Sequence, residues 1–178
     1  IRARVRTSAR PRVPRPPAEG ALMCEPLIGA RVAEPFERLR AAAAATAPTV
    51  FLAALGTAAD FTARAGFARA AFEAGGLAAP GNDGFTDIAA LVEAFRASGA
   101  RLACLCSSDA LYAASAIEAA TALKAAGALR VYLAGKAGED EPAQRAAGVD
   151  VYLFAGVDLV AFLKAAQAAL GIAPGVEP

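Results

Sequence analysis

Short apolar runs alternate with longer segments of helical periodicity along most of the chain. These runs lack the polar alternation of a half-exposed strand, which is typical of parallel strands covered on both faces. Between the runs, apolar residues recur at helical spacing, as Phe61, Ala65, Ala68 and Phe72 do after the first run. The pattern predicts five buried β-strands, at residues 50–55, 77–80, 101–106, 129–134 and 149–155.

The order of these elements predicts the fold class. Five strands that alternate with five helices indicate a doubly wound α/β domain with a five-stranded parallel sheet of the flavodoxin-like type. We predict the strand order 2-1-3-4-5, because Pro80 is tolerated only at a sheet edge and the most apolar strand, 50–55, belongs inside. Ligands of such sheets bind outside the carboxyl ends of the strands. The loops there contain Gly56-Thr57, Gly84, Ser107-Ser108, Gly135 and Gly156.

The composition changes before the predicted sheet. Residues 1–32 are rich in Arg and Pro, which predicts a disordered basic tail, and residues 33–47 predict a linker helix. We place the α/β domain at residues 48–172 and a loose tail at residues 173–178. The chain begins at Ile1 rather than Met, so we expect a fragment, with the tail as part of it or as a reading-frame remnant.

Charge and hydropathy argue against two classes of partner. The first 40 residues hold nine Lys and Arg against four Asp and Glu, but no aromatic side chains interleave with the basic tail. We therefore expect no nucleic-acid partner. No apolar run approaches the roughly 18 residues of a membrane span, and no secretory leader pattern is found. We expect a cytoplasmic protein without a membrane partner.

The residue types restrict the chemistry. Histidine is absent from the sequence, which removes the commonest general base, the Ser-His-Asp and Cys-His arrangements, and imidazole metal ligands. Gly56 stands alone after the first strand, so the dinucleotide fingerprint is absent, and no phosphate loop is found. We interpret Cys104 and Cys106 as small buried hydrophobes, and together with Cys24 they form no zinc-binding pattern. No catalytic or metal-binding residue is assigned.

Several stretches together resemble one protein family. They are Val50-Phe-Leu-Ala-Ala-Leu-Gly-Thr-Ala-Ala-Asp60, Asn82-Asp-Gly-Phe-Thr86, Ala103-Cys-Leu-Cys-Ser-Ser-Asp109 and Val131-Tyr-Leu-Ala-Gly135. These stretches look like the C-terminal cobalamin-binding-type domain of methylmalonyl-CoA mutase, and most of all like that of the small (beta) subunit of the bacterial heterodimeric enzyme. The resemblance runs from about Ala33 to Leu170.

The resemblance implies a cofactor cradle without its metal ligand. The large subunit of the family bears D-x-H-x-x-G in the first turn, where the histidine binds cobalt and the aspartate orients the ring. Asp60 matches the aspartate, but Thr62 occupies the histidine position and Ala65 the glycine position, and threonine is a poor ligand for such a metal. The resemblance assigns weak or vestigial cofactor contacts to Gly56, Thr57, Asp60, Thr62, Ser107, Ser108, Gly135 and Gly156. Helix capping is the simpler interpretation of Asp60 and of the two serines.

For function, the resemblance implies a supporting role. The radical chemistry of the family lies in a (β/α)8 barrel of roughly 250 residues, so this chain alone would not interconvert (R)-methylmalonyl-CoA and succinyl-CoA. We expect a non-catalytic small-subunit domain in a heterodimer whose large subunit holds adenosylcobalamin. Two alternatives stay open. One is a corrinoid-binding domain that holds cobalamin base-on without a histidine ligand, and the other is a free-standing flavodoxin-like small-molecule or regulatory module.

Overall fold

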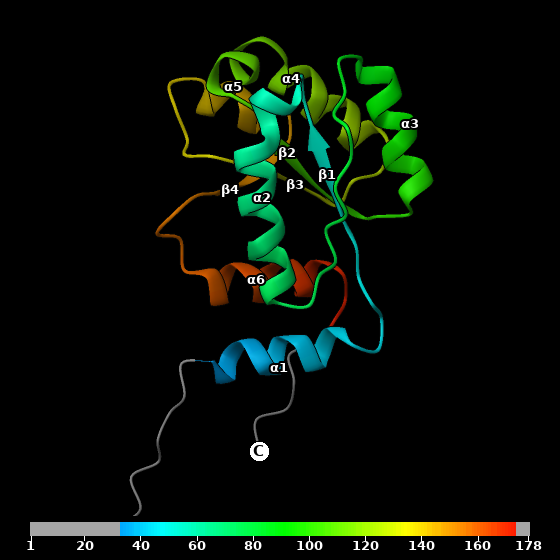
Figure 1. The fold of residues 1–178 in the computed structure, drawn as a ribbon, viewed down its shortest axis with the longest axis vertical. Helices are drawn as coiled ribbons and strands as arrows, with labels where there is room; N and C mark the ends of the chain where they lie inside the picture. The colour runs from blue at the N-terminus through cyan, green and yellow to red at the C-terminus, as the bar shows by residue number, and fades with distance from the viewer. Residues whose placement is uncertain (1–32, 174–178) are drawn as a thin grey trace, which may run out of the picture. The chain divides into compact units, whose positions relative to one another are not determined.

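The computed structural model describes residues 33–173, and the predicted basic tail and residues 174–178 lie outside this range. Six helices and four strands follow one another in a regular order (Figure 1). In chain order they are α1 (Glu34–Ala43), β1 (Val50–Ala54), α2 (Ala58–Ala74), α3 (Ile88–Ser98), β2 (Leu102–Cys106), α4 (Asp109–Ala125), β3 (Arg130–Ala134), α5 (Glu141–Ala146), β4 (Val149–Leu153) and α6 (Leu159–Ala169).

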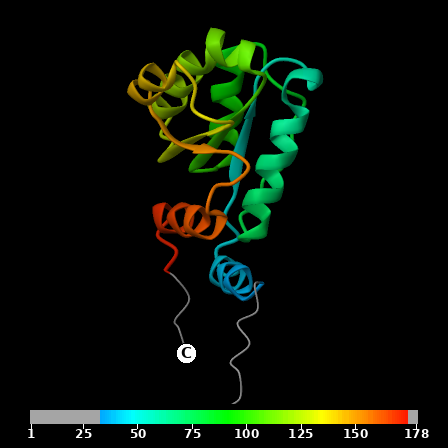
Figure 2. The ribbon, with the colours of Figure 1, turned by 90° about the vertical axis from the view of Figure 1, so that its left-hand side faces the viewer.

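The four strands form a parallel sheet in the order β1-β2-β3-β4. Helices cover both of its faces, as expected for a doubly wound α/β domain (Figures 1 and 2). The alternating residues of β1 separate the two layers of the core. Val50, Leu52 and Ala54 pack with residues of α1, α2 and α6. Phe51 and its odd-numbered neighbours pack with residues of α3 and α4 on the other face.

The predicted second strand at residues 77–80 does not form, so neither the five-stranded sheet nor the order 2-1-3-4-5 is confirmed. Residues 77–85 pair with the β1 segment through two isolated bridges, Thr49 with Ala78 and Leu55 with Phe85. Pro80 has no N–H group to continue a ladder between them. The side chain of Asn82 fills part of the gap by donating a hydrogen bond to the carbonyl oxygen of Leu52 at 2.6 Å.

Local signals set the beginnings of the helices that follow the strands. Asp87 caps α3 by accepting a hydrogen bond from the N–H of Ala90, and Asp158 caps α6 by accepting one from the N–H of Ala161. Gly99 ends α3 in the left-handed conformation, which glycine adopts without a steric penalty. Ser108 stands at the N-cap of α4, but its side chain makes no capping hydrogen bond.

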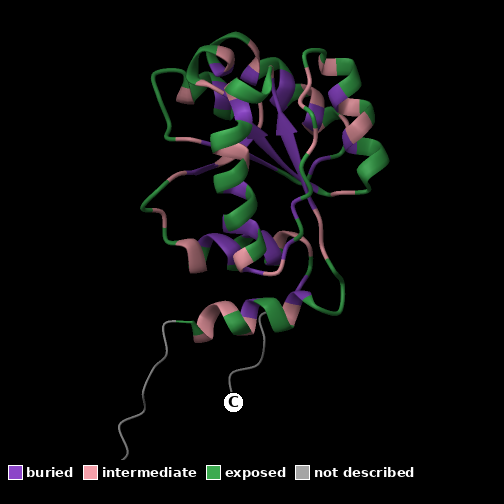
Figure 3. Ribbon diagram, in the orientation of Figure 1, coloured by how far each residue is buried: buried purple, intermediate pink, exposed green. Residues whose placement is uncertain are grey.

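The core has two layers, one on each face of the sheet, and buried residues lie in the strands and on the helices that face them (Figure 3). All five residues of β1 and all five of β2 are buried, which explains why their sequences are apolar without alternation. Each fully buried Leu or Phe side chain contributes about 1.5–3 kcal/mol of transfer free energy. Helix α1 shares this core, because Leu39 is buried against it. None of the described helices is long and apolar enough to span a membrane.

Candidate functional site

The predicted site residues gather mainly at the carboxyl ends of the strands. Gly56 follows β1, Ser107 and Ser108 follow β2, and Gly135 follows β3. Hydrogen bonds join the first two strand ends, because the hydroxyl of Ser107 donates to the carbonyl oxygen of Leu55 at 2.8 Å. The N–H of Gly135 donates to the carbonyl oxygen at the end of β4, Leu153, at 2.8 Å.

Thr57 and Asp60 form a capping box at the start of α2. The hydroxyl and the N–H of Thr57 both donate to one carboxylate oxygen of Asp60, at 2.7 and 2.9 Å. These two hydrogen bonds, with a smaller contribution from the side chain of Ser108, hold the pKa of Asp60 below its ordinary value. The capping interpretation of Asp60 is confirmed, and one of its oxygens is already committed to the helix start.

Thr62 and Gly156 lie apart from the other predicted site residues. Within the described chain, neither makes a hydrogen bond to any of them. Thr62 is exposed on α2, and its hydroxyl donates to the carbonyl oxygen of Ala58 in the preceding turn. Gly156 lies three residues past the end of β4, and a Cβ atom there would meet nothing within 4 Å. Thr62 instead lines a cleft between α2 and the edge of β1.

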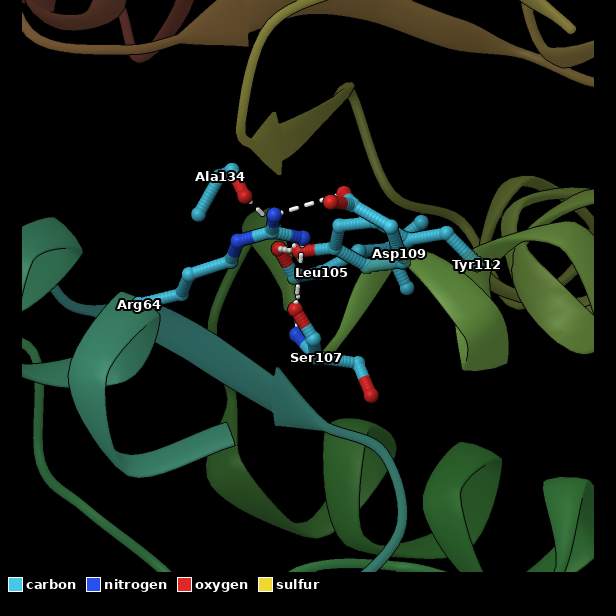
Figure 4. A network of polar contacts seen from close by, with 6 residues as sticks. All are labelled: Arg64, Leu105, Ser107, Asp109, Tyr112 and Ala134. Atoms are coloured by element: carbon cyan, nitrogen blue, oxygen red, sulfur yellow. Dashed lines mark hydrogen bonds and ion pairs between the residues drawn. The ribbon is translucent and has the colours of Figure 1, made fainter. Parts of the chain in front are cut away.

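Arg64 and Tyr112 close the carboxyl ends of β2 and β3, and the sequence prediction did not include either residue. The guanidinium of Arg64 donates to the carbonyl oxygen of Ser107 at 2.7 Å and to the carboxylate of Asp109 at 2.6 Å (Figure 4). Its central carbon lies 5.0 Å from the ring centroid of Tyr112, within the range of a cation–π contact. Arg64 therefore links α2 to the start of α4.

The hydroxyl of Tyr112 is at the centre of the same network. It accepts a hydrogen bond from the N–H of Ser107 at 2.9 Å, and it lies 3.0 and 2.9 Å from the carbonyl oxygens of Leu105 and Ala134 (Figure 4). A Cβ atom on Gly135 would lie 3.6 Å from the guanidinium carbon of Arg64. The space over these strand ends is therefore filled by the chain's own side chains.

The charges of this network are held in place. Partial burial lowers the pKa of Arg64, but the hydrogen bond to Asp109 and the attraction of neighbouring groups outweigh burial, so its pKa lies above the ordinary value. Burial raises the pKa of Tyr112 far above its ordinary value, so the phenol stays neutral. The network presents a fixed cation that is already paired with Asp109, rather than a proton donor or acceptor.

The cysteines of β2 are part of the core. Cys104 and Cys106 are fully buried, and their sulfur atoms lie 4.0 Å apart. The contact with Cys106, together with burial, raises the pKa of Cys104 well above its ordinary value, so its thiol stays protonated and unreactive. The interpretation of both residues as small hydrophobes is confirmed, whereas Cys24 lies outside the described residues.

Comparison with known proteins adds an independent observation. A methylmalonyl-CoA mutase small subunit from Streptomyces virginiae is 48% identical over 126 residues, which are 71% of this chain and 19% of that protein. A methylmalonyl-CoA mutase small subunit from Propionibacterium freudenreichii subsp. shermanii is 43% identical over 147 residues, which are 80% of this chain and 23% of that protein. The matched segment belongs to the methylmalonyl-CoA mutase small-subunit family. No family model matches the chain.

The chain spans about a fifth of the length of these small subunits. Its residues do not fit a corrinoid that needs a lower ligand to cobalt. The sequence has no histidine, and Thr62, at the position of the ligand, turns its hydroxyl back onto its own helix. No group of three or more His, Cys, Asp and Glu side chains suited to a metal ion occurs among residues 33–173. Arg64 and Tyr112 fill the strand ends, where ligands of doubly wound sheets bind.

The sequence contains a signal for the role of Arg64. Arg64 lies three residues after Phe61, so it shares the face of α2 that packs on the sheet. A charged residue on a buried helix face is expected to have a partner. The residues near Arg64 in the sequence do not indicate which partner it has, because Ser107 and Asp109 are more than 40 residues away in the chain.

Proposed function

We propose that this chain is a cobalamin-binding-type domain of a methylmalonyl-CoA mutase small subunit that has a supporting rather than a cofactor-binding role. In this proposal the large subunit holds adenosylcobalamin and interconverts (R)-methylmalonyl-CoA and succinyl-CoA. The small-subunit domain stabilises the heterodimer. The relatives of this chain are named methylmalonyl-CoA mutase small subunits.

The observation that carries the proposal is the closed carboxyl end of the sheet. In a doubly wound sheet this is where a ligand binds. Here Arg64 reaches Ser107 and Asp109 across it, and the hydroxyl of Tyr112 contacts backbone groups of both β2 and β3. Opening the site would break a charge-assisted hydrogen bond and leave buried backbone groups unpaired, which opposes ligand entry.

Titration of residues 1–178 with adenosylcobalamin tests the cofactor part of the proposal. We expect no saturable change in the cobalamin absorption bands at micromolar concentrations. The variant Arg64→Gly serves as a comparison, because it opens the strand ends without adding a cobalt ligand. Tight binding by the unaltered chain, with an altered absorption band, would instead support a domain that holds cobalamin base-on.

A chimera tests the supporting role. In the Streptomyces virginiae small subunit, the segment that matches this chain is replaced by the corresponding residues of this chain, and the chimera is co-expressed with a large subunit. We expect the two subunits to co-purify at the parental ratio and to retain mutase activity. A chimera that folds but fails to retain the large subunit would contradict the supporting role without bearing on cobalamin binding.

A further inference from the structure

A cleft of about 350 Å³ lies between α2 and the edge of β1 that faces away from β2. We call it the β1-edge cleft. It exists because the predicted second strand does not form, so residues 79–84 leave the edge of the sheet between their two bridges. Its volume is at the small end of the range for ligand pockets, about 300–1,000 Å³. It is separate from the closed strand ends at Ser107 and Tyr112, since neither of those residues lines it.

The β1-edge cleft has apolar side chains on two walls, and its polar lining residues are Thr62, Arg69, Asn82 and Asp83. Leu52 and Ala54 of β1 line it on one side, and Phe61 and Ala65 of α2 line it on the other. Gly66 of α2 also lines it, and a Cβ atom added there would meet nothing within 4 Å. These walls favour an aliphatic group, because burying apolar ligand surface there removes it from water.

The guanidinium of Arg69 lies at the cleft. The Nε of Arg69 donates to the carbonyl oxygen of Ala79 at 3.1 Å, which holds the guanidinium beside Gly81. No carboxylate within residues 33–173 lies within ion-pair distance of Arg69. A guanidinium anchored through Nε keeps its outer N–H groups for a carboxylate. The exposed Asp83 also lines the cleft, and its charge disfavours an anion there.

The edge of β1 offers further donors. The N–H of Val50 donates to Ala78 and the N–H of Gly56 donates to Phe85, so even-numbered residues point their N–H groups to this edge. By this alternation the N–H groups of Leu52 and Ala54 lie between those points, and no acceptor within the described chain pairs with them. Both ends of the gap are closed by backbone bridges, which excludes a long added strand and favours a small molecule.

We propose that the β1-edge cleft binds a small monocarboxylic acid with a short aliphatic body. The carboxylate pairs with Arg69, and the aliphatic body packs against Phe61, Ala65 and Leu52. This inference is independent of the supporting role proposed above, because it concerns a different surface and a different ligand.

Two-dimensional ¹⁵N–¹H NMR of residues 1–178, titrated with sodium butyrate, tests this site. We expect saturable shifts in the millimolar range, centred on the amides of Leu52, Ala65, Gly66 and Asp83. The neutral comparison is 1-butanol, which has the same aliphatic body and should bind about fivefold more weakly or worse, because it lacks the charge-assisted hydrogen bonds. Equal shifts with both probes, or butyrate shifts that do not saturate, would overturn the proposal.

Variants distinguish butyrate binding in the cleft from non-specific effects of butyrate on the spectrum. Gly66→Leu should abolish the shifts by filling the cleft, and leucine is the better helix former, so α2 is retained. The matched control is Ala63→Leu on an exposed position of the same helix that does not line the cleft. Arg69→Gln should weaken butyrate binding about fivefold or more, and Asp83→Asn should strengthen it. Unchanged binding in both Gly66→Leu and Arg69→Gln would place the ligand elsewhere.

Discussion

The guanidinium carbon of Arg64 lies 5.0 Å from the ring centroid of Tyr112, although the two residues come from different helices. This pair joins α2 to α4 over the ends of β2 and β3, with Ser107 and Asp109 as the hydrogen-bond acceptors of Arg64. The position that would admit a ligand in a doubly wound sheet is therefore part of the internal hydrogen-bond network. Stability and closure of the site depend on the same side chains.

Replacement of Arg64 by methionine should lower the free energy of unfolding by about 1–2 kcal/mol. The variant keeps an unbranched apolar side chain but leaves the carbonyl of Ser107 without this donor, and partial exposure moderates the loss. Urea denaturation measures the change. Arg96→Met on the exposed surface of α3 is the control and should stay within about 0.5 kcal/mol of the parent. Equal losses in the two variants would contradict the structural role of Arg64.

Tyr112→Phe should cost about 1–3 kcal/mol, because it removes only the hydroxyl and leaves the buried N–H of Ser107 without its acceptor. Tyr132→Phe is a matched control. Tyr132 is also buried, and burial raises its pKa to about 12, but its hydroxyl makes no hydrogen bond within residues 33–173. Thermal unfolding followed by circular dichroism compares the two. The interpretation of Tyr112 fails if both variants unfold at the same temperature.

Asp60→Asn should change how stability depends on pH. The pKa of Asp60 is lower in the folded chain than its ordinary value of 3.8, because Thr57 donates to its carboxylate. Such a group contributes stability that is fully present above its unfolded pKa and is lost as pH falls through its folded pKa. The parent should therefore be more stable than the variant at about pH 6, and the difference should shrink as pH falls below about 4.

Urea denaturation over this pH range provides the measurement. Asp140→Asn is the control, since Asp140 stands at the N-cap of α5 without a side-chain capping hydrogen bond. A stability difference between the parent and Asp60→Asn that stays constant with pH would show that the capping box does not act through the charge of Asp60.

Gln167→Met should loosen α1. The buried amide of Gln167 donates to the carbonyl oxygens of Leu39 and Gly75, at 2.8 and 2.9 Å, and so joins α6 to α1 and to the end of α2. Methionine keeps the length of the side chain but removes the donor to both carbonyl oxygens, at a cost of about 1–3 kcal/mol. Hydrogen exchange should accelerate in α1 before it does in the sheet. Lys164→Met on the exposed face of α6 should leave exchange in α1 unchanged.

The comparison of sequence with structure separates local from long-range information. The strands at Val50–Ala54 and Leu102–Cys106 were predicted from unbroken apolar runs. Residues 77–80 also looked like a strand, but Pro80 and the side chain of Asn82 replaced the ladder by two bridges. Whether residues 77–80 form a strand depends on their hydrogen bonds with β1. The local sequence pattern holds no information about those bonds.

By itself the sequence determined the parallel α/β class, the apolar strands at Val50–Ala54 and Leu102–Cys106, and the absence of a histidine that could bind a metal. These properties follow from residue type and from periodicities within one element. Only the tertiary structure decided that Arg64 closes the strand ends and that a cleft opens beside β1. The closed strand ends and the cleft both depend on contacts between residues that are distant in the sequence. How the helices pack on the sheet sets the geometry of these contacts.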